Sequence, residues 1–106
     1  MKDNFSAMEI AAAIHNSETT AKATIEKTLA EIGRKDSQLN CFTEVFNSSA
    51  IAQADLIDSE KKSGILTGVP FAVKNLFDID GIITLAGSKI NQYNLLAIQD
   101  ATAVAR

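Results

Sequence analysis

One stretch of the chain restricts its conformation more than any other. Residues 68–88 place the single proline, Pro70, between glycines and in front of an apolar run. Pro70 fixes its own φ and disfavours the helical region for Val69, so the chain enters this stretch extended. The apolar residues Phe71 to Val73 continue it, and we predict a strand here.

Lys74 follows the predicted strand directly, and Leu76, Phe77 and Ile79 supply apolar residues around it. Burial disfavours the charged form of a lysine and so yields an amine that can accept a proton near neutral pH. On this pattern Lys74 is a candidate general base. The alternative interpretation is that Lys74 ends an edge strand and points to water. Gly81 then predicts a turn, followed by a second strand over residues 82–86.

The same stretch resembles a known family. Residues 68–88, with Asp100, Ala101 and Val104 downstream, resemble the amidase signature family, which shares a G-x-P-x-x-x-K core, a later Gly-Ser pair and an Asp-Ala helix start. The resemblance implies an α/β protein with the mixed-sheet α/β/α fold of that family. It also implies that Lys74 is the base of a serine, cis-serine, lysine triad that hydrolyses amide C–N bonds.

Asn75 is a departure from the family, since most relatives carry Asp after the lysine. An adjacent carboxylate would favour the ammonium, so Asn75 leaves the neutral form of Lys74 easier to reach. Together with Gly87 and Ser88, Asn75 is a candidate supporting residue. Ser88 is expected to lie near Lys74 and to satisfy the backbone of a Gly-Ser turn. The sequence from 74 to 89 most resembles the biuret and carboxybiuret hydrolase branch.

The serine-rich loop of the family, which supplies both serines of the triad, does not occur in this sequence. Asp100 predicts an N-cap for a helix over 101–106, too short to persist alone. We therefore expect a truncated, N-terminal part of an amidase that is inactive by itself. Two alternatives stay open: the amidase subunit of a tRNA-dependent amidotransferase, and a small non-catalytic binding protein.

Length and charge limit the number of domains and the kinds of partner. With 106 residues, 46% of them hydrophobic, the chain suits one domain. We divide this single amidase domain into a helical part (1–63), the lysine strand and turn (64–90) and a helix start (100–106). The net charge of −3 gives no basic surface, so we expect neither nucleic acid nor a membrane as a direct partner. The expected partners are a small amide substrate and subunits of a homo- or hetero-oligomer.

Cysteine and histidine usage indicates the compartment and argues against a metal. Cys41 is the only cysteine and His15 the only histidine, which gives no ligand set for a transition metal. We expect no cofactor. A lone cysteine and a polar start at residues 1–6, without a signal-peptide pattern, predict a cytoplasmic protein. We expect Cys41 to be a small buried hydrophobe.

Helices are expected to alternate with strands, which predicts an α/β layer architecture. Ser6 and Glu9 form a capping box, and an apolar stripe at Ile25, Leu29 and Ile32 marks a second helix that Gly33 should end. Asp55, Asp58 and Lys61 are expected on the solvated side of a third helix. The predicted elements are helices over 6–14, 20–32 and 49–62, the last closed by Gly64, and a strand over 41–46.

Overall fold

The computed structural model describes residues 4–106, so Met1–Asp3, part of the polar start noted above, lie outside the described residues. The chain divides into two compact units, one ending at Pro70 and the other comprising Phe71–Arg106. The described residues of the first unit, 4–70, form three helices, α1 (Ala7–His15), α2 (Ala21–Leu39) and α3 (Asn47–Glu60). The predicted single amidase domain, with its parts 1–63, 64–90 and 100–106, stays a prediction.

The starts of α1 and α2 are those that the sequence predicts. The Ser6 hydroxyl accepts the Glu9 N–H at 3.2 Å, and the Glu9 carboxylate accepts the Ser6 N–H at 2.7 Å. These two bonds satisfy N–H groups that a helix leaves without partners in its first turn. The Thr20 hydroxyl accepts the Ala23 N–H at 3.0 Å and caps α2 in the same manner.

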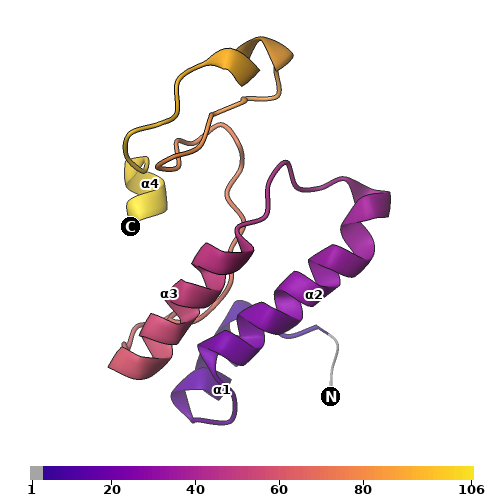
Figure 1. Ribbon diagram of the computed structural model, residues 1–106. Coiled ribbons are helices and arrows are strands. Elements are labelled where there is room, and N and C mark those ends of the chain that lie inside the picture. The colour runs from indigo at the N-terminus through magenta and orange to yellow at the C-terminus, as the bar shows by residue number, and fades with distance from the viewer. Residues whose placement is uncertain (1–3) are drawn as a thin grey trace. The chain divides into compact units, whose positions relative to one another are not determined.

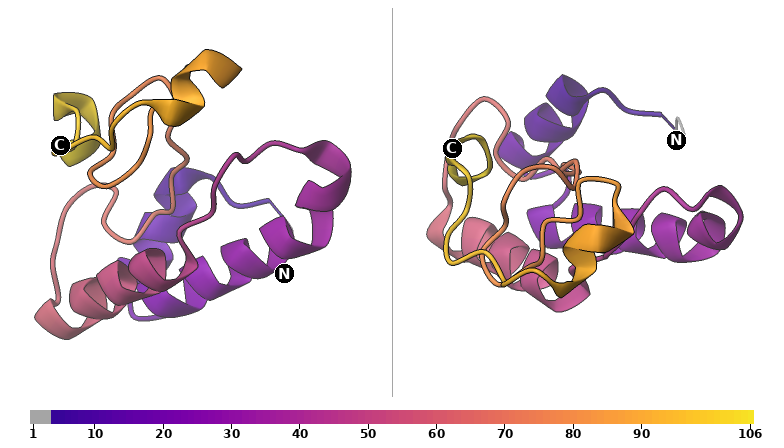
Figure 2. Two further views of the ribbon diagram at one scale, coloured as in Figure 1. Left: turned by 45° about the horizontal axis from the view of Figure 1, so that its top comes forward. Right: turned by 90° about the horizontal axis from the view of Figure 1, so that it is seen from above.

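Helices α2 and α3 lie side by side in both Figure 1 and Figure 2 and form the main helix contact of the first unit. Small side chains make their core, with Ala21 only 1% exposed and Ala54 5%. A small side chain lets neighbouring backbone approach closely, and Gly68 lies against Ala21 for this reason. The predicted stripe of Ile25, Leu29 and Ile32 is half-buried along α2.

The prediction that Gly33 ends the second helix is wrong, because α2 continues to Leu39. A glycine inside a helix costs only about 1 kcal/mol relative to alanine, which neighbouring turns can offset. Asn40, at φ 51°, is the left-handed residue that ends α2. The Asp36 carboxylate then accepts the Cys41 N–H at 2.7 Å and fixes the chain as it leaves the helix.

Three further predictions for the first unit are corrected. Helix α3 ends at Glu60 with Lys61 in the left-handed conformation (φ 47°), before Gly64 is reached. Residues 41–46 form no strand, and Cys41 is exposed rather than buried. Because the loop over 41–46 has no neighbouring strand with which to pair, its apolar residues alone do not make one.

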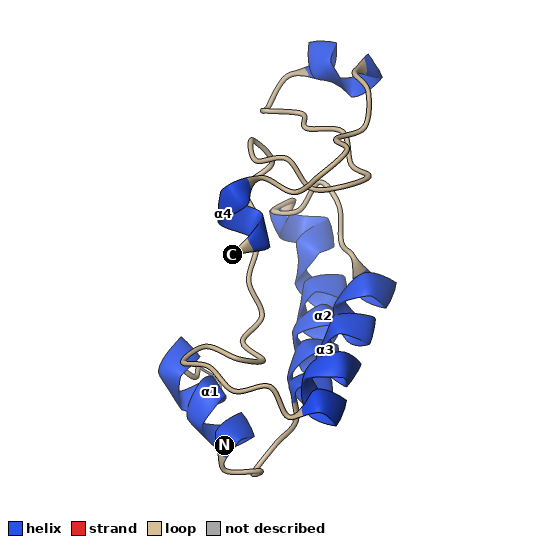
Figure 3. Cartoon of the chain, turned by 90° about the vertical axis from the view of Figure 1, so that its left-hand side faces the viewer, coloured by secondary structure: helices blue, strands red, loops and turns tan. Residues whose placement is uncertain are grey.

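The second unit consists mainly of turns. Figure 3 shows loop between its short helices η1 (Lys89–Tyr93, a 3₁₀ helix) and α4 (Thr102–Ala105). The strands predicted over 71–73 and 82–86 do not form, and residues 4–106 contain no strand at all. Gly81 N–H donates to the Ala97 carbonyl at 2.8 Å and Ala97 N–H donates to the Ile82 carbonyl at 2.9 Å. Such a single pair of bonds is not a ladder, so the predicted α/β architecture is not confirmed.

No helix within the described part of the chain combines the length and apolar composition that crossing a membrane requires.

Candidate functional site

Lys74 lies at the start of a turn in the second unit. Its carbonyl accepts the N–H groups of Leu76, at 2.7 Å, and Phe77, at 3.2 Å. Its side chain is exposed, so the expected burial of Lys74 is wrong. Leu76 and Phe77 do not supply apolar cover, since they are themselves 45% and 42% exposed. The structure thus presents a solvent-accessible amine on a backbone that the turn constrains.

Asn75 links this turn to a segment ten residues further along the chain. Its side-chain Oδ1 accepts the Leu85 N–H at 3.0 Å, and its backbone carbonyl accepts the Ala86 N–H at 2.8 Å. The bond to Leu85 is partly buried, where hydrogen bonds compete less with water. The residue next to Lys74 is therefore bound to the 85–88 segment through both its side chain and its backbone.

Residues 85–88 form a tight turn that contains the predicted Gly-Ser pair. Ala86 (φ 46°) and Gly87 (φ 70°) are both left-handed, a conformation that glycine adopts readily and alanine does not. The Leu85 carbonyl accepts the Ser88 N–H at 3.0 Å and the Asn91 side-chain N–H at 2.8 Å. Four hydrogen bonds, counting the two that Asn75 accepts, thus hold the turn around the strained residue Ala86 in place.

The Ser88 side chain forms a hydrogen bond with the backbone next to this turn. Its hydroxyl accepts the Ile90 N–H at 3.4 Å and caps η1. In the described chain the Ser88 hydroxyl makes no hydrogen bond to Lys74. The structure therefore brings Asn75 to the 85–88 turn, whereas it does not join the Ser88 and Lys74 side chains.

A second set of links spans the residues after Lys74. The Asp78 carboxylate accepts the Thr84 hydroxyl, and its backbone carbonyl accepts the Ala101 N–H at 2.8 Å. Asp100 accepts the Asp80 N–H at 2.8 Å instead of capping the last helix, whose N-cap is Ala101. The prediction of Asp100 as an N-cap is thus wrong, because its carboxylate has a partner in another turn.

Sequence reasoning missed the roles of Asp78, Thr84 and Asn91. Asn91 had no local signal, because its contact depends on how the 85–88 turn folds back. The ability of Asp and Asn to accept backbone N–H groups at turns was the available signal for Asp78.

The arrangement offers the accessible amine of Lys74 as its candidate reactive group. No three metal-ligating side chains of His, Cys, Asp or Glu gather anywhere in residues 4–106. An amine acts as a general base only when a proton donor lies within hydrogen-bond reach, directly or through a relay.

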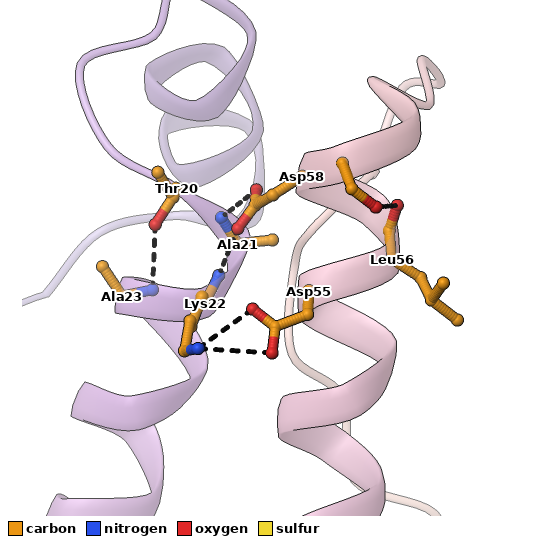
Figure 4. A network of polar contacts seen from close by, with 8 residues as sticks. Thr20, Ala21, Lys22, Ala23, Asp55, Leu56 and Asp58 are labelled. Atoms are coloured by element: carbon orange, nitrogen blue, oxygen red, sulfur yellow. Dashed lines mark hydrogen bonds and ion pairs between the residues drawn. The ribbon is translucent and has the colours of Figure 1, made fainter.

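The polar network of the first unit is structural (Figure 4). The Asp58 carboxylate receives the N–H groups at the start of α2, while Asp55 pairs with the Lys22 ammonium at 3.1 Å. The hydrogen bond from Lys22 to Asp55 and the negative charge of that carboxylate raise the pKa of Lys22. The prediction that Asp55 and Asp58 face only solvent is thus partly wrong, because both aspartates bind α2.

Comparison with known proteins relates this chain to a family. The Amidase family model matches residues 23–106, which include Lys74 and the 85–88 turn. AtzE of Pseudomonas sp. (strain ADP), a subunit of 1-carboxybiuret hydrolase, is 45% identical over 103 residues, which are 93% of this chain and 22% of that protein. A glutamyl-tRNA(Gln) amidotransferase subunit of Lachnospira eligens is 37% identical over 91 residues, which are 82% of this chain and 19% of that protein.

A solved structure of a related protein has a similar fold. It is an inhibitor-bound form of a vestigial protein complex that reveals the evolutionary origins of an s-triazine catabolic enzyme. Its TM-score is 0.90 at 42% identity, over 95% of this chain and 23% of the solved one. The chain spans about a fifth of the length of the curated relatives it matches. The matched region, the sequence identities and the structural similarity together show that this chain belongs to the amidase family.

Proposed function

We propose that this chain is the lysine-bearing part of an amidase that hydrolyses an amide C–N bond, with Lys74 as the general base. The observation that carries the proposal is the placement of Lys74, an exposed amine in the family-matched region whose neighbour Asn75 is bound to the 85–88 turn. A constrained backbone helps to hold a reactive group in the geometry that general-base catalysis requires.

In the proposed reaction a serine oxygen attacks the amide carbon, and its proton passes through a cis-serine to the neutral amine of Lys74. The C–N bond then breaks, and Lys74 returns the proton to the leaving nitrogen. Water hydrolyses the acyl-serine and restores the free serine. This chain matches about a fifth of the length of its amidase relatives. We propose that both serines belong to the remaining part of an amidase, so that residues 1–106 are inactive alone.

The proposed substrate is a small amide of the biuret type. The resemblance of residues 74–89 to the biuret and carboxybiuret hydrolase branch supports this choice, as does the 45% identity to a 1-carboxybiuret hydrolase subunit. We further propose that the complete protein works with a partner subunit, since both named relatives are subunits.

A second candidate function is glutaminase activity within a tRNA-dependent amidotransferase. Amidotransferase subunits at 37% to 42% identity support it. Such a protein would pass ammonia to a partner rather than release it. Dependence on ATP, on tRNA and on partner subunits therefore separates this candidate from a hydrolase.

The experiment that tests the proposal measures ammonia release by the full-length protein from biuret, 1-carboxybiuret and glutamine, each with and without ATP. We expect release from a biuret-type amide that does not depend on ATP. Glutamine hydrolysis that appears only with charged tRNA, ATP and partner subunits would establish the amidotransferase instead. Absence of all amide hydrolysis from a folded full-length protein would contradict both and leave the non-catalytic binding protein.

A further inference from the structure

We propose that Asn75, assisted by Asn91, is a positioning residue that holds the Lys74 backbone in register with the 85–88 turn. This inference rests on the proposed role of Lys74 as general base and adds the residues that place it. The proposed function uses the Asn75 contact only to describe where Lys74 lies, and it gives Asn91 no part.

Asn75 is suited to this role because it makes two bonds to consecutive residues. Its Oδ1 accepts from Leu85 and its backbone carbonyl accepts from Ala86, at 3.0 and 2.8 Å. Two acceptors on one residue fix both the separation and the relative orientation of the two segments. Because Asn75 is bonded covalently to Lys74, this pairing also limits how far the lysine backbone can move.

Asn91 contacts the other backbone polar group of Leu85, its carbonyl. Its side-chain N–H donates to the Leu85 carbonyl at 2.8 Å in a partly buried bond. The N–H and the carbonyl of Leu85 are thus bound by two different asparagine side chains. Two independent contacts at one residue keep the turn from rotating about the Asn75 bond.

The left-handed conformation of Ala86 supports the same conclusion. A non-glycine residue at φ 46° is strained, and such strain persists only where the surroundings determine the backbone. The bonds at Leu85 and Ala86 supply that restraint. Strain kept beside the proposed general base fits a turn whose position matters to the reaction.

The test compares Asn75→Ala, Asn75→Asp and Lys74→Ala in the full-length protein by steady-state kinetics on the amide that it hydrolyses. Asn75→Ala removes the Oδ1 acceptor, and we expect kcat to fall by about 10- to 100-fold with KM little changed, as for a misplaced catalytic group. Asn75→Asp keeps an oxygen that can accept the Leu85 N–H, so it should restore most of kcat.

Comparison of Asn75→Ala with Asn75→Asp gives a readout that a merely structural role would not move, because the loss of kcat at nearly constant KM and its recovery both depend on the oxygen that accepts the Leu85 N–H. Failure of Asn75→Asp to restore kcat would overturn the proposal.

Asp100→Ala is the matched control, because it also removes a side-chain oxygen that accepts a backbone N–H in the second unit. Its kcat should stay within about twofold of the unmodified value, since surface changes away from the reacting groups have small effects. A loss equal to that of Asn75→Ala would show general loosening of the unit and overturn the positioning role.

Asn91→Ala covers the case in which Asn75→Ala does not fold. It leaves both Asn75 bonds in place, and we expect a several-fold loss of kcat; an unchanged kcat would contradict the proposal. If Lys74→Ala is inactive while Asn75→Ala keeps full activity, the positioning role alone fails. If Lys74→Ala is active, the proposed function fails and the positioning role fails with it.

Discussion

The carboxylate of Asp58, on α3, accepts the backbone N–H of Ala21, in the first turn of α2, at 2.8 Å. Its second oxygen accepts the N–H of Lys22 at 3.0 Å. A negative charge at a helix N-terminus is favourable, because N–H groups there lack partners within the helix. The Asp58 side chain thus joins α3 to the first turn of α2, next to the buried residue Ala21.

Replacing Asp58 tests this contact. Asp58→Ala leaves both N–H groups without their acceptor, and we expect a loss of about 1–2 kcal/mol, as for removal of an N-cap. Urea unfolding of the full-length protein measures it, with hydrogen exchange of residues 21–24 as the local readout. Asp58→Asn keeps one acceptor and should lose less. Equal stability of Asp58→Ala and the unmodified protein would show that the contact contributes nothing.

Gly68 and Gly33 make a matched pair of glycines with opposite expectations. At Gly68 (φ +82°) an added Cβ would lie 2.6 Å from Ile14 Cδ1 and 3.2 Å from Ala21 Cβ, so Gly68→Ala should destabilise by about 1–3 kcal/mol. At Gly33, inside α2, an added Cβ meets nothing within 4 Å, and Gly33→Ala should stabilise by about 1 kcal/mol. Thermal unfolding of the two variants checks the signs, and the same sign for both would contradict the packing described.

Glu9 gives a pH dependence. Hydrogen bonds from the Ser6 backbone and hydroxyl hold the pKa of Glu9 below its ordinary value of 4.5. A carboxyl whose pKa is lowered by folding stabilises the native form above its unfolded pKa and loses that contribution as the pH falls through its folded pKa. Hydrogen-exchange protection of α1, corrected for intrinsic rates, should be constant from pH 7 to about 5 and fall below about 4.5. In Glu9→Gln this fall should be absent; persistence of the same fall would assign it to another group.

Local signals predicted the starts of α1 and α2 and failed at the ends of α2 and α3. Ser6 and Thr20 are capping residues whose partners lie three residues away, so the sequence alone contains both halves of each contact. The end of α2 depends instead on Asn40 adopting a left-handed conformation. Glycine adopts that conformation readily, so Gly33 offered the same signal, but it was the wrong choice because a helix tolerates an isolated glycine.

Contacts between distant segments could not be predicted in the same way. Asp58 was expected in solvent because its helix position is polar, and only the packing of α3 on α2 gives it a partner 37 residues away. Lys74 was identified by motif, yet its exposure and the Asn75 link to Leu85 depend on how two turns fold together. The predicted strands failed for the same reason, since a strand is defined by pairing that its own residues do not specify.

The most direct test of the central claim is kcat for amide hydrolysis by the full-length Lys74→Ala variant, with circular dichroism as the check on folding. Lys89→Ala is the control, because Lys89 is an exposed lysine of the same unit that the proposed reaction does not use. We expect Lys74→Ala to lose roughly 100- to 10,000-fold in kcat with its fold retained, and Lys89→Ala to lose almost nothing. Near-normal turnover by a folded Lys74→Ala protein would contradict the assignment of Lys74 as the general base.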